Sequence, residues 1–243
     1  FNIVLPVAVK DLVYDGTAHE LVTEITPEVG VTFKYSLDGG SYNTTLPKAT
    51  EAGAHIVKLQ VFSARRKVHE VEFTVTIAPK ELALTWEGSS FTYNSKPQAP
   101  VAKLDGVIGT DDVKAVVSGA QTNVGTGYEA TVTLDGPKAS NYKLPVEVTT
   151  TFDIIAADPV LTAAPAANTL TYNATAQDLV AEGNATGGKL MYSTDGTTWT
   201  ETIPQGTEAK IYTLYYKIVG DANHNSTDTS EPVNVTISQK AID

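Results

Sequence analysis

The chain of 243 residues carries 28 acidic and 17 basic side chains, for a formal net charge of −11, and 42% of its residues are hydrophobic. This acidic balance disfavours nucleic acid and anionic lipid as partners, and no apolar run is long enough to cross a bilayer, so we expect neither nucleic-acid binding nor membrane insertion in this segment. Because cysteine is absent, packing alone must hold the fold together.

One phrase occurs three times along the chain. Its copies are LVYDGTAHELV at 12–22, FTYNSKPQAPV at 91–101 and LTYNATAQDLV at 170–180. Their tyrosines, Tyr14, Tyr93 and Tyr172, follow one another at intervals of 79 positions. A fixed period near 80 residues predicts a tandem array of small domains, each with a modest core of its own. The predicted repeats are 1–79, 80–157 and 158–243.

Alternating segments end each repeat, in the order FTVTI at 73–77, TFDII at 151–155 and VNVTI at 233–237. Every second side chain is apolar or aromatic, which is typical of a sheet with one buried face. A longer alternating segment precedes each of them, at 56–61, 128–134 and 212–218. Asp-Gly dipeptides at 38–39, 135–136 and 195–196 are typical of tight hairpins. The sequence therefore predicts an all-β fold of β-sandwiches without a long helix.

The junctions between repeats are short. Only Ala78-Pro79-Lys80 separates the first repeat from the second, and 156–159, which includes Pro159, separates the second from the third. Short linkers that contain proline restrict the angle between neighbours. We therefore expect an extended array whose repeats share little buried surface. The segment ISQKAID at 237–243 resembles IAPKELA at 77–83, which indicates that a further repeat continues the parent protein.

Each copy of the phrase combines an apolar strand with a turn. Asp15, Asn94 and Asn173 directly follow the tyrosines, and such side chains bond to nearby backbone and tolerate a left-handed φ. We interpret the phrase as a strand–turn–strand corner. Tyr14, Tyr93 and Tyr172 are then structural residues that point into the core of their own repeat, and a ligand-binding role for them is the alternative.

Longer matches carry a family resemblance. The first and third repeats align over FKYSLDGGSYNTTLPKAT at 33–50 and LMYSTDGTTWTETIPQGT at 190–207, whereas the second departs from them at 106–125 and forms another subtype. Tyr-Asp-Gly at 14–16, these hairpins and VVSGAQTNVGTGYEATVTLDGPKASNYKLP at 116–145 resemble the MBG/YDG class of bacterial immunoglobulin-like repeats. The resemblance covers almost the whole chain. It implies three tandem immunoglobulin-like β-sandwich domains in an extracellular bacterial protein, secreted or on the cell surface, where they serve as a spacer or as part of an adhesin.

Signatures of catalysis are lacking. The sequence has no nucleophile elbow, phosphate-binding loop or dinucleotide fingerprint, and its four histidines lack metal-ligand spacing. We expect no enzyme. Asp221, Asn223 and Asn225 occupy positions 1, 3 and 5 of a calcium loop, but Ser226 replaces the glycine at position 6. A polar hairpin tip is the favoured interpretation, Ca²⁺ the alternative, and no other cofactor is expected.

Two aromatic side chains follow Asp-Gly turns at equivalent positions, Tyr42 and Trp199. They can cap the end of the core, which we favour, or stack on a sugar ring or a protein surface. The first hypothesis for function is thus a non-catalytic spacer, a monomer whose partners are the adjoining repeats of the same chain. The alternative is a module that binds glycan or host protein through these hairpin tips.

Overall fold

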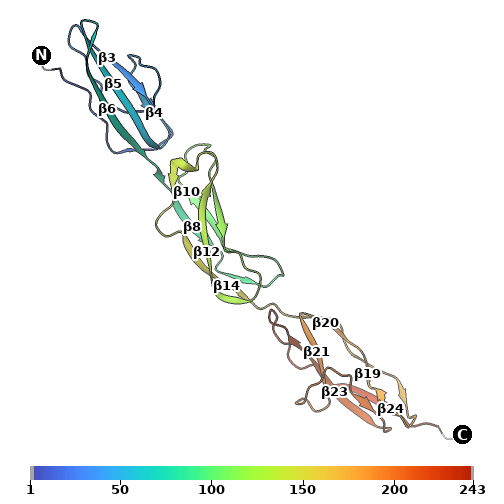
Figure 1. The fold of residues 1–243 in the computed structure, drawn as a ribbon. Helices are drawn as coiled ribbons and strands as arrows, with labels where there is room; N and C mark the ends of the chain where they lie inside the picture. The colour runs from blue at the N-terminus through green and yellow to red at the C-terminus, as the bar shows by residue number, and fades with distance from the viewer. Residues whose placement is uncertain (1–2, 242–243) are drawn as a thin grey trace. The chain divides into compact units, whose positions relative to one another are not determined.

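The computed structural model describes residues 3–241, so the outermost residues of the first and third predicted repeats lie outside the described part. Within it, every element is a β-strand except one turn of 3-10 helix, η1 (Ala139–Asn141), which confirms the all-β prediction. The chain folds into two compact units. The first holds Phe1–Glu87, Pro100–Ser118 and Ala130–Thr150, and the second holds Gly88–Ala99, Gly119–Glu129 and Thr151–Asp243. The division runs through the second predicted repeat, so each junction between repeats lies inside one unit. Figure 1 shows the strands along the chain, coloured from the N-terminus to the C-terminus.

The first repeat is built on a four-stranded sheet in the order β1-β6-β5-β3. Strand β1 is parallel to β6, the other pairs are antiparallel, and β2 pairs with β4. The strands are β1 (Leu12–Val13), β2 (His19–Glu20), β3 (Val31–Leu37), β4 (Lys48–Ala49), β5 (Gly53–Ser63) and β6 (Arg66–Ala78). Val57, Leu59 and Val61 on β5 are fully buried, because alternate residues of a strand face the same side of the sheet.

The first unit also contains a large part of the second repeat. Its strands are β7 (Lys80–Glu81), β8 (Ala83–Glu87), β10 (Val101–Asp105), β11 (Lys114–Ser118), β13 (Tyr142–Lys143) and the last part of β12 (Gly125–Asp135). Strand β7 is parallel to β13, whereas β8 pairs antiparallel with β10 and β11 with β12. One hydrophobic core runs from Ile77 of the first repeat to Leu82 and Tyr142 of the second. Our prediction that the junctions share little buried surface is therefore wrong for the first junction.

In the second unit, β9 (Ser90–Thr92) runs parallel to the end of β14 (Thr149–Ile155). The buried ring of Phe152 packs against Phe91 and Tyr128, with ring centroids 5.8 and 5.7 Å away. These aromatic contacts form the core of that part of the second repeat that belongs to the second unit.

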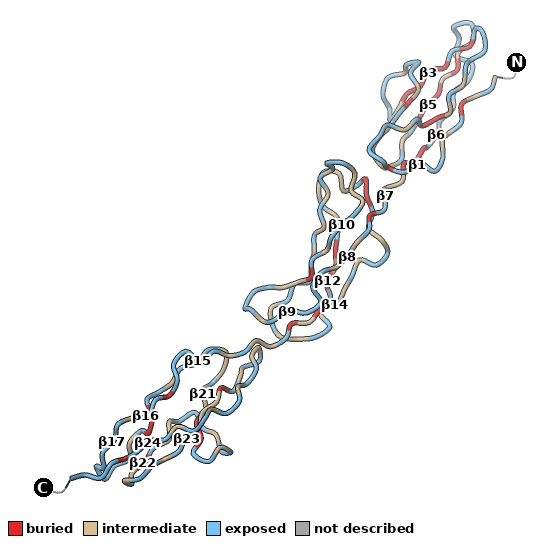
Figure 2. Tube along the Cα trace, turned by 180° about the vertical axis from the view of Figure 1, so that it is seen from behind, coloured by how far each residue is buried: buried red, intermediate tan, exposed pale blue. Residues whose placement is uncertain are grey.

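The third repeat follows in the same unit and repeats the topology of the first, with a sheet in the order β17-β24-β23-β21. Its strands are β15 (Val160–Ala163), β16 (Ala166–Ala167), β17 (Leu170–Thr171), β18 (Gln177–Asp178), β19 (Val180–Ala181), β20 (Asn184–Thr186), β21 (Gly188–Ser193), β22 (Gln205–Gly206), β23 (Ile211–Gly220) and β24 (Val233–Ser238). A second core cluster forms around Leu179, Tyr192 and Leu214. Figure 2 shows buried residues on inner strands such as β5 and on edge strands such as β3 and β21.

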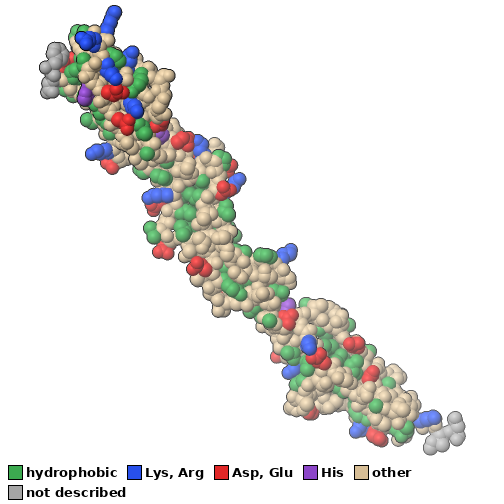
Figure 3. All heavy atoms as spheres, in the orientation of Figure 1, with side chains coloured by type: hydrophobic (Ala, Val, Ile, Leu, Met, Phe, Trp, Pro, Cys, Tyr) green, Lys and Arg blue, Asp and Glu red, His purple; other side chains and the backbone are tan. Residues whose placement is uncertain are grey.

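The surface carries both signs of charge. On the face shown in Figure 3, basic and acidic side chains are interspersed rather than gathered into one patch. Within residues 3–241, no helix is long and apolar enough to cross a membrane.

Candidate functional site

The repeated phrase forms the same corner in all three repeats. The backbone N–H groups of the three tyrosines donate to the ends of the last strands, in the pairs Tyr14–Ala78, Tyr93–Ile155 and Tyr172–Ser238, at 2.8–2.9 Å. Each tyrosine therefore stands where the last strand leaves its sheet. This is the end of the repeat from which the chain passes to its continuation.

The turn after each tyrosine is closed by the predicted side-chain bond. One side-chain oxygen of Asp15, Asn94 and Asn173 accepts from the backbone N–H two residues ahead at 2.8–2.9 Å. The left-handed φ falls on the next residues, Gly16, Ser95 and Ala174. The bonded side chain holds its own residue in place, so the chain reverses one position later.

The three tyrosines differ in burial. Tyr14 is 3% exposed, Tyr93 is half-buried and Tyr172 is 37% exposed. The prediction that each points into the core of its own repeat therefore fails for Tyr172. The reason lies in the junctions, because in the first two copies it is the following repeat that covers the tyrosine.

At the first junction, Tyr142 of the second repeat meets Tyr14 edge to face, with ring centroids 5.4 Å apart and planes at 77°. Both phenols donate to the same Oδ2 of Asp111, Tyr14 at 2.7 Å and Tyr142 at 2.5 Å. These bonds, first from Tyr142 and then from Tyr14, lower the pKa of the Asp111 carboxyl. Burial and the bond to Asp111 raise the pKa of Tyr142, and the bond to Asp111 followed by burial raises that of Tyr14.

Asn141, the residue before Tyr142, is fully buried at 0% exposure and bonds to two neighbouring residues of the first repeat. Its Oδ1 accepts from the backbone N–H of Ala52 at 2.7 Å, and its Nδ2 donates to Glu51 at 2.5 Å. Lys138 donates to the other oxygen of Glu51 at 2.5 Å. The bonds from Lys138 and Asn141 lower the pKa of Glu51. These contacts satisfy each polar group of a buried amide.

The second junction has the same construction from different residues. Oδ1 of Asn223 accepts from the backbone N–H of Val124 at 2.9 Å, and its Nδ2 donates to the Asn123 side chain at 3.3 Å. The next residue, His224, meets Tyr93 edge to face at 5.2 Å and 81°. The half-buried Tyr93 is thus covered as Tyr14 is.

The linker backbone is also used in the same way. At the first junction, Lys80 pairs in parallel with Tyr142, and at the second, Ala157 pairs in parallel with His224. We call the Asn–aromatic dipeptide of the following repeat, Asn141-Tyr142 or Asn223-His224, the plug. The plug docks on a set of residues that we call the socket. The socket consists of Tyr14, Glu51, Ala52 and Lys80 at the first junction, and of Tyr93, Asn123, Val124 and Ala157 at the second.

Sequence reasoning missed the plug. Its residues lie between the long strand and the last strand of the second and third repeats, and the two loops share only an asparagine followed by an aromatic residue. In the first repeat this connection is the tight turn at Ala64 and Arg65, between β5 and β6. The loops at 136–148 and 221–232 are much longer than this turn, and their length was the signal in the sequence that could have pointed to the plug.

The predicted calcium loop coincides with the second plug. The Asp221 carboxylate accepts from the N–H of Asn223 at 2.8 Å and contacts Nδ1 of His224 at 2.7 Å, and these bonds, His224 first, lower its pKa. Nδ2 of Asn225 donates to Asp158 at 2.9 Å. The three candidate ligands thus turn to different partners, and residues 3–241 contain no group of three His, Cys, Asp or Glu side chains suited to a metal. Calcium binding stays a prediction.

The two candidate binding aromatics already have polar partners. The hydroxyl of Tyr42 donates to Glu70 at 2.9 Å, and the ammonium of Lys217 lies 4.3 Å from the centre of the Trp199 ring, a cation–π contact. Both side chains are half-buried, and neither belongs to the hydrophobic cluster of its repeat. The expected role as a cap on the core is therefore not the arrangement found.

Comparisons with known proteins do not assign the chain to a family. No family model matches the chain, and no curated protein matches it in sequence. Among solved structures it is similar to Sidekick-1 immunoglobulin domains 1–5, with 11% identity and a TM-score of 0.36 over 99% of this chain and 60% of that one. It is also similar to the Bacteroides ovatus mixed-linkage glucan utilization locus protein SGBP-B, in complex with mixed-linkage heptasaccharide, with 14% identity and a TM-score of 0.25 over 96% and 67%. Neither likeness assigns an activity or a ligand.

Acid should loosen the first junction. Asp111 and Glu51 have pKa values lowered from their ordinary 3.8 and 4.5. A carboxyl whose folded-state pKa is depressed stabilises the fold above its unfolded pKa, and this contribution is lost as the pH falls through the folded value. We expect the first unit to unfold at lower urea concentrations when the pH is below about 4. The fluorescence of Trp86, which lies in this unit, measures the unfolding. In Asp111→Asn this loss should be smaller, and an equal loss would contradict the role of Asp111.

Proposed function

We propose that this segment is a non-catalytic spacer of a bacterial cell-surface or secreted protein, in which immunoglobulin-like repeats of the MBG/YDG type carry an adhesin or another functional head. The observation that carries the proposal is that both junctions are docked by the same plug and socket. A spacer keeps its length only if its junctions resist bending, and a linker of a few residues with several polar contacts and a ring contact does so.

The chemistry of the junctions supports this role. The docked amide of Asn141 is fully buried and bonded on both of its polar atoms. Pulling the repeats apart would expose one donor and one acceptor that are already paired, together with the apolar ring contact. The aromatics that we considered for glycan, Tyr42 and Trp199, are engaged with Glu70 and Lys217. The spacer role therefore needs no ligand.

Small-angle scattering of the 243-residue chain tests the spacer. Sandwiches built on strands of about ten residues are each roughly 33 Å long, so three end to end should span about 100–120 Å. We expect a radius of gyration of about 30–35 Å, whereas a compact globule of this length would give about 18 Å. A value near 20 Å would contradict the proposal. The double variant Asn141→Gly and Asn223→Gly should give a broader distribution of distances.

A further inference from the structure

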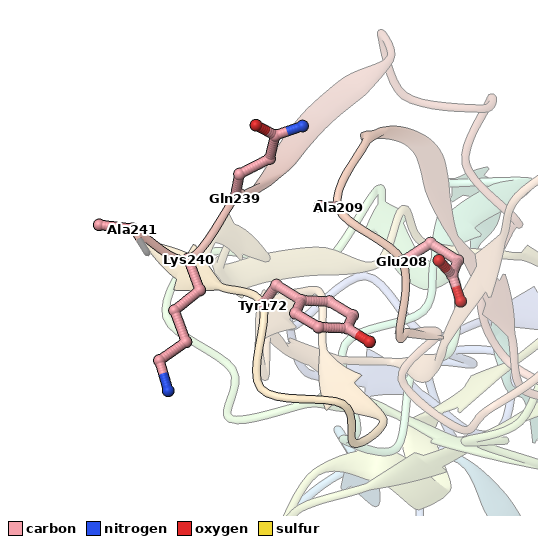
Figure 4. Close-up of a pocket in the computed structure, with 6 residues that line it drawn as sticks. All are labelled: Tyr172, Glu208, Ala209, Gln239, Lys240 and Ala241. Atoms are coloured by element: carbon pink, nitrogen blue, oxygen red, sulfur yellow. The ribbon is translucent and has the colours of Figure 1, made fainter. Parts of the chain in front are cut away.

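The third repeat carries a socket with nothing docked on it among the described residues. Tyr172, Glu208, Ala209, Gln239, Lys240 and Ala241 line a hollow of about 700 Å³ at the end of the repeat. Figure 4 shows the ring of Tyr172 pointing toward the segment of Glu208, with the side chain of Lys240 directed away. All of these residues belong to the second unit.

This hollow corresponds residue by residue to the first socket. Tyr172 bonds to the last strand as Tyr14 does. Thr207-Glu208-Ala209 repeats Thr50-Glu51-Ala52 just before the long strand. In the third repeat the buried Ile237 pairs with Leu170, and Lys240 comes three positions later. In the first repeat the buried Ile77 pairs with Leu12, and Lys80 comes three positions later.

The groups that a plug would use are available. At the first socket, the N–H of Ala52, the carboxylate of Glu51 and the hydroxyl of Tyr14 are all bonded to the second repeat. Among the described residues, no hydrogen bond uses the N–H of Ala209, the carboxylate of Glu208 or the hydroxyl of Tyr172. The same three groups are thus presented in the same order, and Tyr172 is 37% exposed.

We propose that this third socket docks a further repeat of the second subtype, joined directly behind residue 243, whose Asn–Tyr plug bonds to Glu208 and Ala209 and stacks on Tyr172. The inference rests on the proposed spacer function and names the partner that such a spacer takes at this end. The segment ISQKAID at 237–243 matches IAPKELA at 77–83, which leads in the first repeat into the strand that pairs with the plug.

Charge selects the subtype of the partner. The third socket has a carboxylate, Glu208, where the first has Glu51, which binds Lys138 beside the plug. The second socket has the neutral Asn123 at this position. Its side chain accepts from the amide of Asn223, and among the described residues no lysine donates to it. A plug of the second-repeat type, with an amide and a lysine, therefore fits the third socket better than one of the third-repeat type.

One difference between the two sockets affects the fit of the incoming repeat. At the first, a Cβ on Gly16 would lie 2.9 Å from Cγ2 of Ile108. The third copy has Ala174 there, also with a left-handed φ. The incoming side chain that corresponds to Ile108 must therefore be smaller, or it must shift as a whole, because Cγ2 of a β-branched residue moves only with its stiff χ1 angle or with the backbone.

The test is an extended chain, residues 1–243 followed by a second copy of residues 84–157. Amide hydrogen exchange is measured by NMR at Ala209 in the extended and the parent chains. We expect exchange at Ala209 to slow about fivefold or more in the extended chain, the factor that corresponds to one net hydrogen bond. As a control, the asparagine of the appended copy that corresponds to Asn141 is replaced by alanine. The exchange rate at Ala209 should then return to its value in the parent chain, while the N–H of Ala52 stays protected by its bond to the original Asn141.

Several results would overturn the proposal. An unchanged rate at Ala209 contradicts it once the spectrum of the extended chain shows a second set of folded amide signals from the appended copy. Protection of Ala209 in the parent chain that grows with protein concentration would make a second copy the occupant instead. The spacer function itself fails only in the scattering of the 243-residue chain, so the two failures can be told apart.

Discussion

Replacement of Tyr142 by alanine should lower the free energy of unfolding of the first unit by about 3–5 kcal/mol, the usual cost of removing a buried aromatic ring. Tyr142 lies in the core cluster that joins the first repeat to the second, and it covers Tyr14. Its loss leaves a cavity, and Asp111 keeps only one of its two phenol donors. Urea denaturation followed by Trp86 fluorescence, in a Trp199→Phe background that leaves one tryptophan, measures the change.

Tyr142→Phe is the matched control. The ring contact with Tyr14 remains, and only the bonds of the hydroxyl to Asp111 and to the N–H of Ile108 are lost. We expect a smaller loss of about 1–3 kcal/mol, because the N–H of Ile108 is left without its partner. If Tyr142→Ala destabilised the unit no more than Tyr142→Phe does, the ring would not be part of a shared core.

Asn141→Ala should weaken the first junction without unfolding either repeat. The substitution removes the acceptor of the Ala52 N–H and one donor to Glu51. An unsatisfied buried N–H costs about 1–3 kcal/mol unless water reaches it, and opening of the junction lets water in. We expect faster hydrogen exchange at Ala52 and a loss of urea resistance in that range.

Asn223→Ala is the counterpart at the second junction. It should speed exchange at Val124 and leave Ala52 unchanged, because the two plugs lie in different units. If either substitution alone sped exchange at both Ala52 and Val124, the two junctions would not be separate docking sites. Unchanged exchange at Ala52 in Asn141→Ala would contradict the proposed role of the buried amide.

Taken together, the two junctions explain why a tyrosine recurs every 79 positions. It is not needed for the core of its own repeat, since Tyr172 remains exposed in a repeat whose core cluster is built from other residues. What the first two tyrosines share is an edge-to-face contact with an aromatic residue of the next repeat. In its first two copies the phrase therefore marks the end of a repeat where another one docks.

Local sequence patterns were enough to predict the main strands. The alternating segments at 73–77 and 233–237 lie within β6 and β24, and 56–61 lies within β5, because the two-residue period of a strand is a local property. The side-chain bond after each tyrosine was equally predictable, since Asp15 and its counterparts bond to backbone only two positions ahead. The third repeat was also expected to resemble the first, and the two sheets have the same strand order.

The contacts between repeats could not be predicted from local sequence and became visible in the folded chain. Asn141 bonds to Ala52 across 89 positions, and Asn223 bonds to Val124 across 99. No periodicity connects such residues, and the partners change from Glu51 to Asn123 and from Tyr142 to His224 while the geometry stays the same. The exposure of Tyr172 was undetermined for the same reason, because burial at the end of a repeat depends on the neighbour that packs against it and not on the local sequence.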